Sequence, residues 1–240
     1  MTRLIALCFV VTACGTDAAP PYTPRPPSIP PPASVNAMYA APSDREFNAE
    51  YSAAIIGAVE AVRDWYAEKL GGRTFTFSDT IPLWCQLAED HAFFLNQSTK
   101  RWLAFAVENA VKDCADIASG SYHAWVVYTD LMEPCGPEYG LGRGGSSNAW
   151  LGAWDLVGLT DPEYSHCGQE IYGPNRWIGG LAHEMGHAFG LPHPPGCDEG
   201  LSTCDHEALM ATGYSNWPDT YLRDDEKEVL LDGRFMNSEK

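Results

Sequence analysis

The chain has 240 residues and a formal net charge of −17, and 45% of its residues are hydrophobic. This length suits one domain of ordinary size with a short appendage, and the apolar content excludes a disordered chain. The acidity argues against nucleic acid as a partner, because a phosphate backbone attracts basic surfaces. Solubility explains such acidity, and a preference for basic substrates or bound calcium are the alternatives.

The N-terminus has the pattern of an export signal. Arg3 provides a positive start, and the apolar run from Leu4 to Val11 is too short to span a bilayer. The sequence Val11-Thr12-Ala13-Cys14 resembles the lipobox of bacterial lipoproteins, in which the cysteine is acylated and becomes the mature N-terminus. We therefore expect a signal peptide over residues 1–13 and lipidation of Cys14. Ordinary signal cleavage beside a bystander cysteine is the alternative.

Residues 14–33 are expected to form a tether. The sequence PPYTPRPPSIPPP favours polyproline II, lacks the apolar residues of a core and acts as a semi-rigid spacer. Docking to a proline-binding partner is the alternative. Gly15 stands where an aspartate would retain a Gram-negative lipoprotein at the inner membrane. The expected location is therefore the cell envelope, at the outer membrane or the cell surface, with one domain over residues 34–240.

Strand and helix patterns alternate along the first part of this domain. Strands are predicted at Ser34–Ala41, Arg73–Phe77, Tyr122–Thr129 and Asn148–Trp154, and helices at Arg45–Leu70, Thr99–Ile117, Asn175–Phe189 and Asp224–Leu231. Ser43 or Asp44 is the expected N-cap of the first helix. The apolar Tyr122–Thr129 is expected at the centre of the sheet, and Gly140–Gly145 is expected to be a loop. The alternation predicts an α/β (α+β) layer structure.

The stretch His183–His193, HEMGHAFGLPH, carries the chemistry of the chain. On a helix His183 and His187 lie one turn apart on the same face, so both can bind a single metal ion. A turn at Gly190 brings His193 back as a third ligand. Three nitrogen ligands with an open fourth position are typical of catalytic zinc. Glu184 lies beside the ligands, where a carboxylate acts as general base on the attacking water.

The pattern HExxHxxGxxH, followed downstream by Met210, resembles the metzincin clan of zinc endopeptidases. The resemblance implies a twisted mixed sheet, a long backing helix and an active-site helix in an upper subdomain, residues 34–193. It implies a small irregular lower subdomain, residues 194–240, with Met210 as an apolar floor beneath the histidines. The family within the clan stays open: Pro194 after the third histidine is as in serralysin-type enzymes, but no glycine-rich calcium-binding repeats follow.

The same resemblance suggests where a peptide substrate would bind. We expect it to extend along an edge strand formed by Asn148–Trp154, gaining backbone hydrogen bonds by strand addition. Trp150, Tyr214 and Trp217 are the candidate substrate-binding residues. In some metzincins a tyrosine two residues after the methionine assists at the zinc, but here Thr212 occupies that position and Tyr214 lies two residues further on.

Six cysteines remain after Cys8, which lies in the signal, and Cys14. An even number in an exported domain suggests disulfides. Because each closes a local loop, the predicted pairs are Cys85–Cys114, Cys135–Cys167 and Cys197–Cys204. A structural calcium ion at Gly140–Gly145, or near Asp155 and Asp161, is a further hypothesis.

The leading functional hypothesis is an exported, lipid-anchored, monomeric zinc endopeptidase that cleaves a protein or peptide substrate. A zinc hydrolase of a non-protein amide is the nearest alternative. A surface binding module that keeps zinc for stability, without turnover, is the second. The presence of Glu184 in a complete motif favours turnover, because a structural zinc site needs no general base.

Overall fold

The computed structural model describes residues 33–97, 100–115, 117, 122–132, 142–145, 147–165, 167 and 173–239. All of these belong to one compact unit. The predicted signal peptide, Cys14 and all but the last residue of the predicted tether lie outside the described residues.

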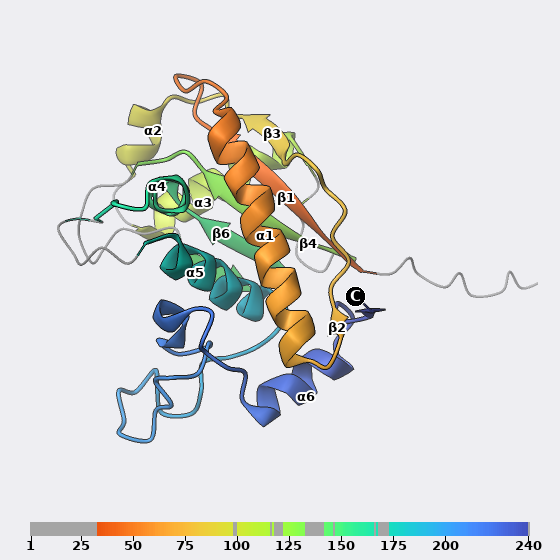
Figure 1. The fold of residues 1–240 in the computed structure, drawn as a ribbon. Coiled ribbons are helices and arrows are strands. Elements are labelled where there is room, and N and C mark those ends of the chain that lie inside the picture. The colour runs from red at the N-terminus through yellow and green to blue at the C-terminus, as the bar shows by residue number, and fades with distance from the viewer. Residues whose placement is uncertain are drawn as a thin grey trace, which may run out of the picture. The chain divides into compact units, whose positions relative to one another are not determined.

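A five-stranded mixed sheet forms the centre of this unit (Figure 1). Its strands, in the order β3-β1-β4-β6-β5, are Leu83–Gln86, Ser34–Ala41, His123–Thr129, Asn148–Leu151 and Arg143–Gly145. The first four run parallel, and β5 pairs antiparallel with β6. The predicted α/β class is confirmed, and β4 is the central strand, as its apolar sequence predicts. A second, two-stranded sheet joins β2 (Arg73–Thr74) to β7 (Ser238–Glu239).

Helices cover both faces of the main sheet. One face packs against α1 (Ala49–Lys69), α4 (Ala153–Thr160) and α5 (Gly173–Ala188), and the other against α2 (His91–Leu95) and α3 (Lys100–Ala110). In Figure 1, α1 crosses in front of β1 and β4. The last helix is α6 (Asp224–Asp232). No helix in the described part of the chain is both long enough and apolar enough to cross a bilayer.

Strand β1 shows how the sequence fixes its own register. Val35, Ala37 and Tyr39 are buried with residues of α1 and α5, whereas Met38 and Ala40 are buried with residues of α3. Successive side chains of a strand point to opposite faces, so both sets must be apolar in a sheet covered on both sides. A shift by one residue would exchange the two sets, and packing therefore selects one register.

The long helix α1 begins later than its sequence pattern predicts. Its N-cap is Asn48, whose Oδ1 accepts hydrogen bonds from the amides of Glu50 (2.9 Å) and Tyr51 (3.3 Å). The predicted caps, Ser43 and Asp44, are therefore wrong. Asp44 instead accepts a hydrogen bond from the amide of His91 at 2.8 Å, which ties the loop before α1 to the start of α2.

Two predicted strands are shorter in the structure. Of the predicted strand Arg73–Phe77, Arg73–Thr74 pairs with β7, and Thr76 forms only an isolated bridge with Ser34. Phe75 and Phe77 are buried in the core. The predicted strand Asn148–Trp154 ends at Leu151, because α4 begins at Ala153. The Asp155 carboxylate accepts a hydrogen bond from the amide of Gly152 at 3.2 Å, and this local contact stabilises the start of the unpredicted helix.

Candidate active site

Helix α5 carries the first two histidines and ends as the motif requires. Gly190 has a φ of +103°, in the left-handed region. Its amide bonds the carbonyl of His187 at 3.0 Å, and the amide of Leu191 bonds the carbonyl of Gly186 at 3.0 Å. This pair of bonds is the Schellman arrangement, which closes a helix and reverses the chain. The reversal brings His193 to the other two histidines, as the sequence predicts.

The three histidines form a candidate metal site. One ring nitrogen from each of His183, His187 and His193 lies within 4.8 Å of the others. The Nε2 atoms of His187 and His193 are 3.1 Å apart. Among the described residues this is the only group of three or more His, Cys, Asp or Glu side chains placed to hold a metal ion.

Every one of these histidines donates a hydrogen bond from Nδ1 to an oxygen acceptor. The pairs are His183 with the Leu209 carbonyl (2.8 Å), His187 with the Leu191 carbonyl (2.8 Å), and His193 with Asp198 Oδ1 (2.6 Å). An acceptor at Nδ1 keeps the proton there and leaves the lone pair on Nε2. The donor set therefore fits a catalytic zinc ion, which typically has three imidazole nitrogens as protein ligands.

The protonation of the ligands also suits a metal. Burial lowers the pKa of His183, whose exposed fraction is 7%, to about 4. Burial likewise lowers the pKa of His187. Both imidazoles are thus neutral at pH 7, which is the form that binds a metal ion.

Strand β5 lies directly against α5 beside Glu184. A Cβ atom on Gly144 would lie 2.0 Å from the backbone oxygen of Glu184 and 2.6 Å from Cβ of His187. A Cβ atom on Gly142 would lie 3.4 Å from Oε1 of Glu184. Only glycine at position 144 permits this approach, so the glycines bring a strand edge close to Glu184.

Arg143 anchors the same strand on the other face of the sheet. Its guanidinium forms an ion pair with Glu108 of α3 and lies 5.6 Å from the ring centroid of Trp150. Burial lowers the pKa of Arg143, and the negative charge of Glu184 partly offsets this effect. Sequence reasoning missed this residue, because β5 reads as a glycine-rich loop and its low β-propensity gives no strand signal.

The predicted substrate edge is therefore wrong in detail. Asn148–Leu151 is β6, an inner strand that pairs with β4 on one side and β5 on the other. The edge of the sheet beside α5 is β5, Arg143–Gly145. An edge strand has unpaired backbone groups along its outer side, and these are what an added strand requires.

Of the three candidate substrate-binding residues, only Tyr214 lies at the site. Its ring centroid is 5.2 Å from that of His183. Trp150 is 4% exposed and packs in the core between the sheet and α3, on the face away from α5. It faces that way because its neighbours Ala149 and Leu151 face α5. Trp217 is buried, and its ring centroid is 4.9 Å from that of Trp65.

Met210 lies against the active-site helix. Its side chain is fully buried, and a Cβ atom on Gly186 would lie 2.3 Å from its Sδ. The amide of the preceding Leu209 bonds the Tyr221 carbonyl at 2.9 Å, which fixes the turn. Met210 thus packs beneath the helix turn that separates His183 from His187.

The structure contains the disulfides Cys85–Cys114 and Cys197–Cys204, with Cα atoms 5.7 Å and 4.5 Å apart. Both were predicted from the local loops that they close. Cys167 is also disulfide-bonded. Its predicted partner, Cys135, falls in a part of the chain that the structure does not describe.

Calcium stays a prediction. Asp155 bonds the Gly152 amide, and the Asp161 carboxylate accepts a hydrogen bond from the amide of Glu163 at 2.9 Å. These bonds give both carboxylates a local structural role. Of the loop predicted at Gly140–Gly145, residues 143–145 form β5, and residues 140–141 fall outside the described ranges.

Comparison with known proteins places the fold. Neither the protein-family models nor the curated protein sequences give a match. Among solved structures, wild-type OgpA from Akkermansia muciniphila is similar, with a TM-score of 0.57 and 15% identity over 85% of this chain and 61% of OgpA. Catalytically inactive OgpA from the same organism, in complex with an O-glycopeptide substrate, gives a TM-score of 0.55 with the same identity and coverage.

An archaemetzincin from Methanopyrus kandleri also matches, at a TM-score of 0.46 and 17% identity over 82% of this chain and 93% of that one. This TM-score is too low for the match to support an inference about the fold. The likeness to OgpA, at 15% identity, shows a shared fold over 61% of the length of OgpA.

Proposed function

We propose that this protein is a zinc-dependent endopeptidase of the metzincin type. One observation carries the proposal. Three histidines with occupied Nδ1 atoms converge beside Glu184, which lies against the edge strand β5. The fold shared with OgpA supports it, because an OgpA structure holds an O-glycopeptide substrate. Met210 beneath the helix is consistent with the same class.

Nε2 of His183, His187 and His193 would hold the zinc ion. Bound zinc supplies a positive charge that activates water for attack and stabilises the developing oxyanion. Glu184 accepts the proton of the attacking water and donates it to the leaving amine. Tyr214, beside His183, is placed to contact the substrate near the scissile bond.

The substrate is proposed to be a polypeptide that binds in extended form along the outer edge of β5. Backbone groups of residues 142–145 would pair with it by strand addition. The O-glycopeptide bound by OgpA makes glycosylated peptides a substrate class to include in any test. Plain and glycosylated peptides of one sequence would show whether the sugar matters.

We further propose that the protein is exported and acts as a monomer anchored by lipid at Cys14. The disulfides Cys85–Cys114 and Cys197–Cys204 support export, because disulfides persist in oxidising compartments. The domain limits remain those of the sequence prediction, residues 34–193 and 194–240. Mass spectrometry of the mature protein should show an acylated Cys14 at its N-terminus. A free N-terminus at another residue would contradict the proposed lipid anchor.

The function is tested by digesting a mixed library of peptides and glycopeptides with zinc-loaded protein. We expect internal cleavage that a chelator abolishes and added zinc restores. A library that stays intact after long incubation, with zinc bound, would point to a binding module. Hydrolysis of non-protein amides without cleavage of any peptide would point to the alternative function, a zinc hydrolase of a non-protein amide.

A further inference from the structure

The three ligand histidines are held in two different ways. His183 and His187 lie on α5, and their Nδ1 atoms donate to backbone carbonyls. His193 lies after the helix, and its Nδ1 donates to the side chain of Asp198 at 2.6 Å. The side chains of His193 and Asp198 are 37% and 72% exposed. The third ligand therefore depends on a side chain that is itself mostly in solvent.

Asp198 belongs to an irregular loop, residues 194–205, which we call the disulfide loop. Cys197, the residue before Asp198, is bonded to Cys204. Within the loop, backbone amides of Cys197, Gly200, Leu201 and Cys204 bond carbonyls of the same loop at 2.8–3.1 Å. Gly196 has a φ of +83°, and a Cβ atom there would lie 2.5 Å from Thr203 Oγ1. The loop is thus folded tightly on itself.

Core packing contributes little to holding this loop. Leu201, its one large apolar side chain between the two cysteines, is exposed. The hydrogen bond between His193 and Asp198 joins two partly exposed side chains, and a contact of this kind is too weak to fix a loop by itself. The disulfide restricts the conformations open to the chain around Asp198, because it closes a short ring.

We propose that the Cys197–Cys204 disulfide, acting through Asp198, sets how tightly the protein holds its metal ion at His193. Asp198 is a positioning residue: it fixes the orientation and tautomer of the third ligand. A dithiol reductant breaks the sulfur–sulfur bond, leaves two protonated thiols on the loop and is itself oxidised to a disulfide. Metal retention would then be sensitive to redox conditions. This inference rests on the proposed zinc site.

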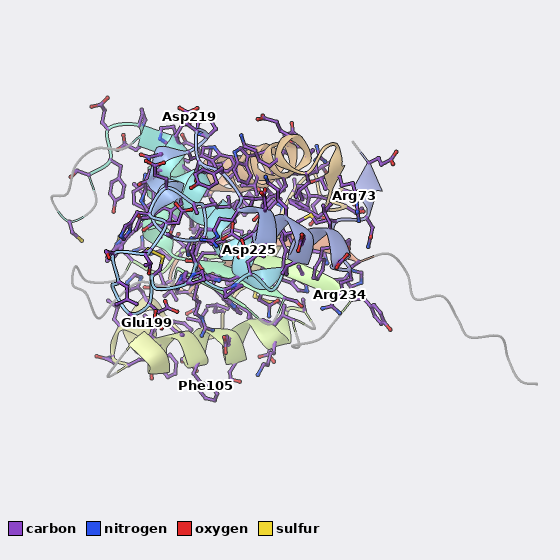
Figure 2. All side chains as sticks on the ribbon, turned by 90° about the horizontal axis from the view of Figure 1, so that it is seen from below. Arg73, Phe105, Glu199, Asp219, Asp225 and Arg234 are labelled. Carbon is purple, nitrogen blue, oxygen red and sulfur yellow. A yellow bond between two sulfur atoms is a disulfide. The ribbon has the colours of Figure 1, made fainter. Side chains whose placement is uncertain are left out.

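The first test measures zinc affinity by competition with a chromophoric chelator. We expect Asp198→Ala to weaken zinc binding roughly 10-fold or more, as loss of an orienting partner does at other metal sites. Glu199→Ala is the matched control, because Glu199 is exposed, has the same charge and is the next residue in the loop (Figure 2). It should change the affinity less than about twofold. Equal affinities for both variants would overturn the proposal.

The second test asks whether the disulfide acts through Asp198. We expect Cys197→Ser/Cys204→Ser to weaken zinc binding, and Asp198→Ala added to it to have little further effect. The control is Cys85→Ser/Cys114→Ser, which removes the disulfide between β3 and the turn after α3 and should leave the affinity unchanged. If circular dichroism shows that this control does not fold, the test still rests on the comparison of Cys197→Ser/Cys204→Ser with and without Asp198→Ala.

Additive losses of affinity from the disulfide and from Asp198 would contradict the proposal, because independent effects would mean that the disulfide does not act through this carboxylate. The readout is zinc binding, so the result is independent of peptide cleavage. Failure of the wild-type protein to bind zinc would instead contradict the proposed site itself.

Discussion

At the scale of single residues, His183 shows how the fold prepares a ligand. It is buried, and its Nδ1 donates to the carbonyl of Leu209, the residue before Met210. Burial opposes protonation and the carbonyl fixes the tautomer, so the neutral ring presents Nε2. The sequence motif predicts which residues bind a metal, but it contains no sign of these partners, because Leu209 and Asp198 lie outside it.

A pH dependence of stability follows for the metal-free protein. The pKa of His183 is about 4 when folded and 6.5 in its ordinary state, so the unfolded chain binds more protons between these values. The free energy of unfolding should therefore fall as the pH drops through this window, by about 2 kcal/mol between pH 7 and pH 5 from this residue. Urea unfolding at both pH values measures the effect. In His183→Gln the free energy of unfolding should fall less between pH 7 and pH 5 than in the wild type, by this amount. An identical fall in both proteins would refute the account.

At the scale of elements, sequence patterns predict the bounds of a strand correctly where the packing of its side chains alone determines them. The bounds of β1, Ser34–Ala41, are as predicted, because apolar side chains are needed on both of its faces. Sequence patterns fail at β5. The close approach to α5 requires glycine in this strand, and the glycine-rich sequence therefore resembles that of a loop. The prediction that Trp150 binds substrate is wrong for a related reason. The sequence gives no sign of β5, and nothing in it therefore shows which face of β6 lies toward the site.

Gly144 tests the contact between β5 and α5. Gly144→Ala places a methyl group 2.0 Å from the backbone oxygen of Glu184, so the strand must move away. We expect the free energy of unfolding to fall by about 1–3 kcal/mol and the rate of peptide cleavage to fall with it. Thermal unfolding and peptidase assays check this.

The matched control is Gly57→Ala on α1, where a Cβ atom meets nothing within 4 Å. Because alanine favours a helix over glycine, this variant should be about 0.5–1 kcal/mol more stable, with unchanged cleavage. A Gly144→Ala protein that behaves like Gly57→Ala would show that β5 does not need to lie so close to the helix.

At the scale of the whole described unit, polar contacts tie the C-terminal segment to α1, β2 and α5. The indole of Trp65 donates to the Pro218 carbonyl at 3.0 Å, and Arg73 donates to the carbonyls of Leu231 and Met236 at 3.0 Å each. His183 donates to Leu209 of the same segment. A metal ion at the histidines would add one more link between α5 and the chain that follows it.

Metal removal should therefore lower the stability of the protein. A ligand present at 100 times its Kd stabilises the folded state by about 2.7 kcal/mol. Chelation should lower the melting temperature, and zinc should restore it in the wild-type protein and in Glu184→Gln, since Glu184 is not a proposed ligand. His187→Ala should show no such response. Restoration by zinc in that variant would place the metal elsewhere.

The central claim is that Glu184 works as a base beside three metal-bound histidines, and one comparison tests it most directly. Zinc-loaded wild-type protein and Glu184→Gln, verified to contain equal amounts of zinc, are assayed on a peptide that the wild type cleaves. We predict a fall in kcat of about 10²–10⁴-fold in the variant, with KM little changed. A Glu184→Gln protein that cleaves the peptide at the wild-type rate would contradict the account.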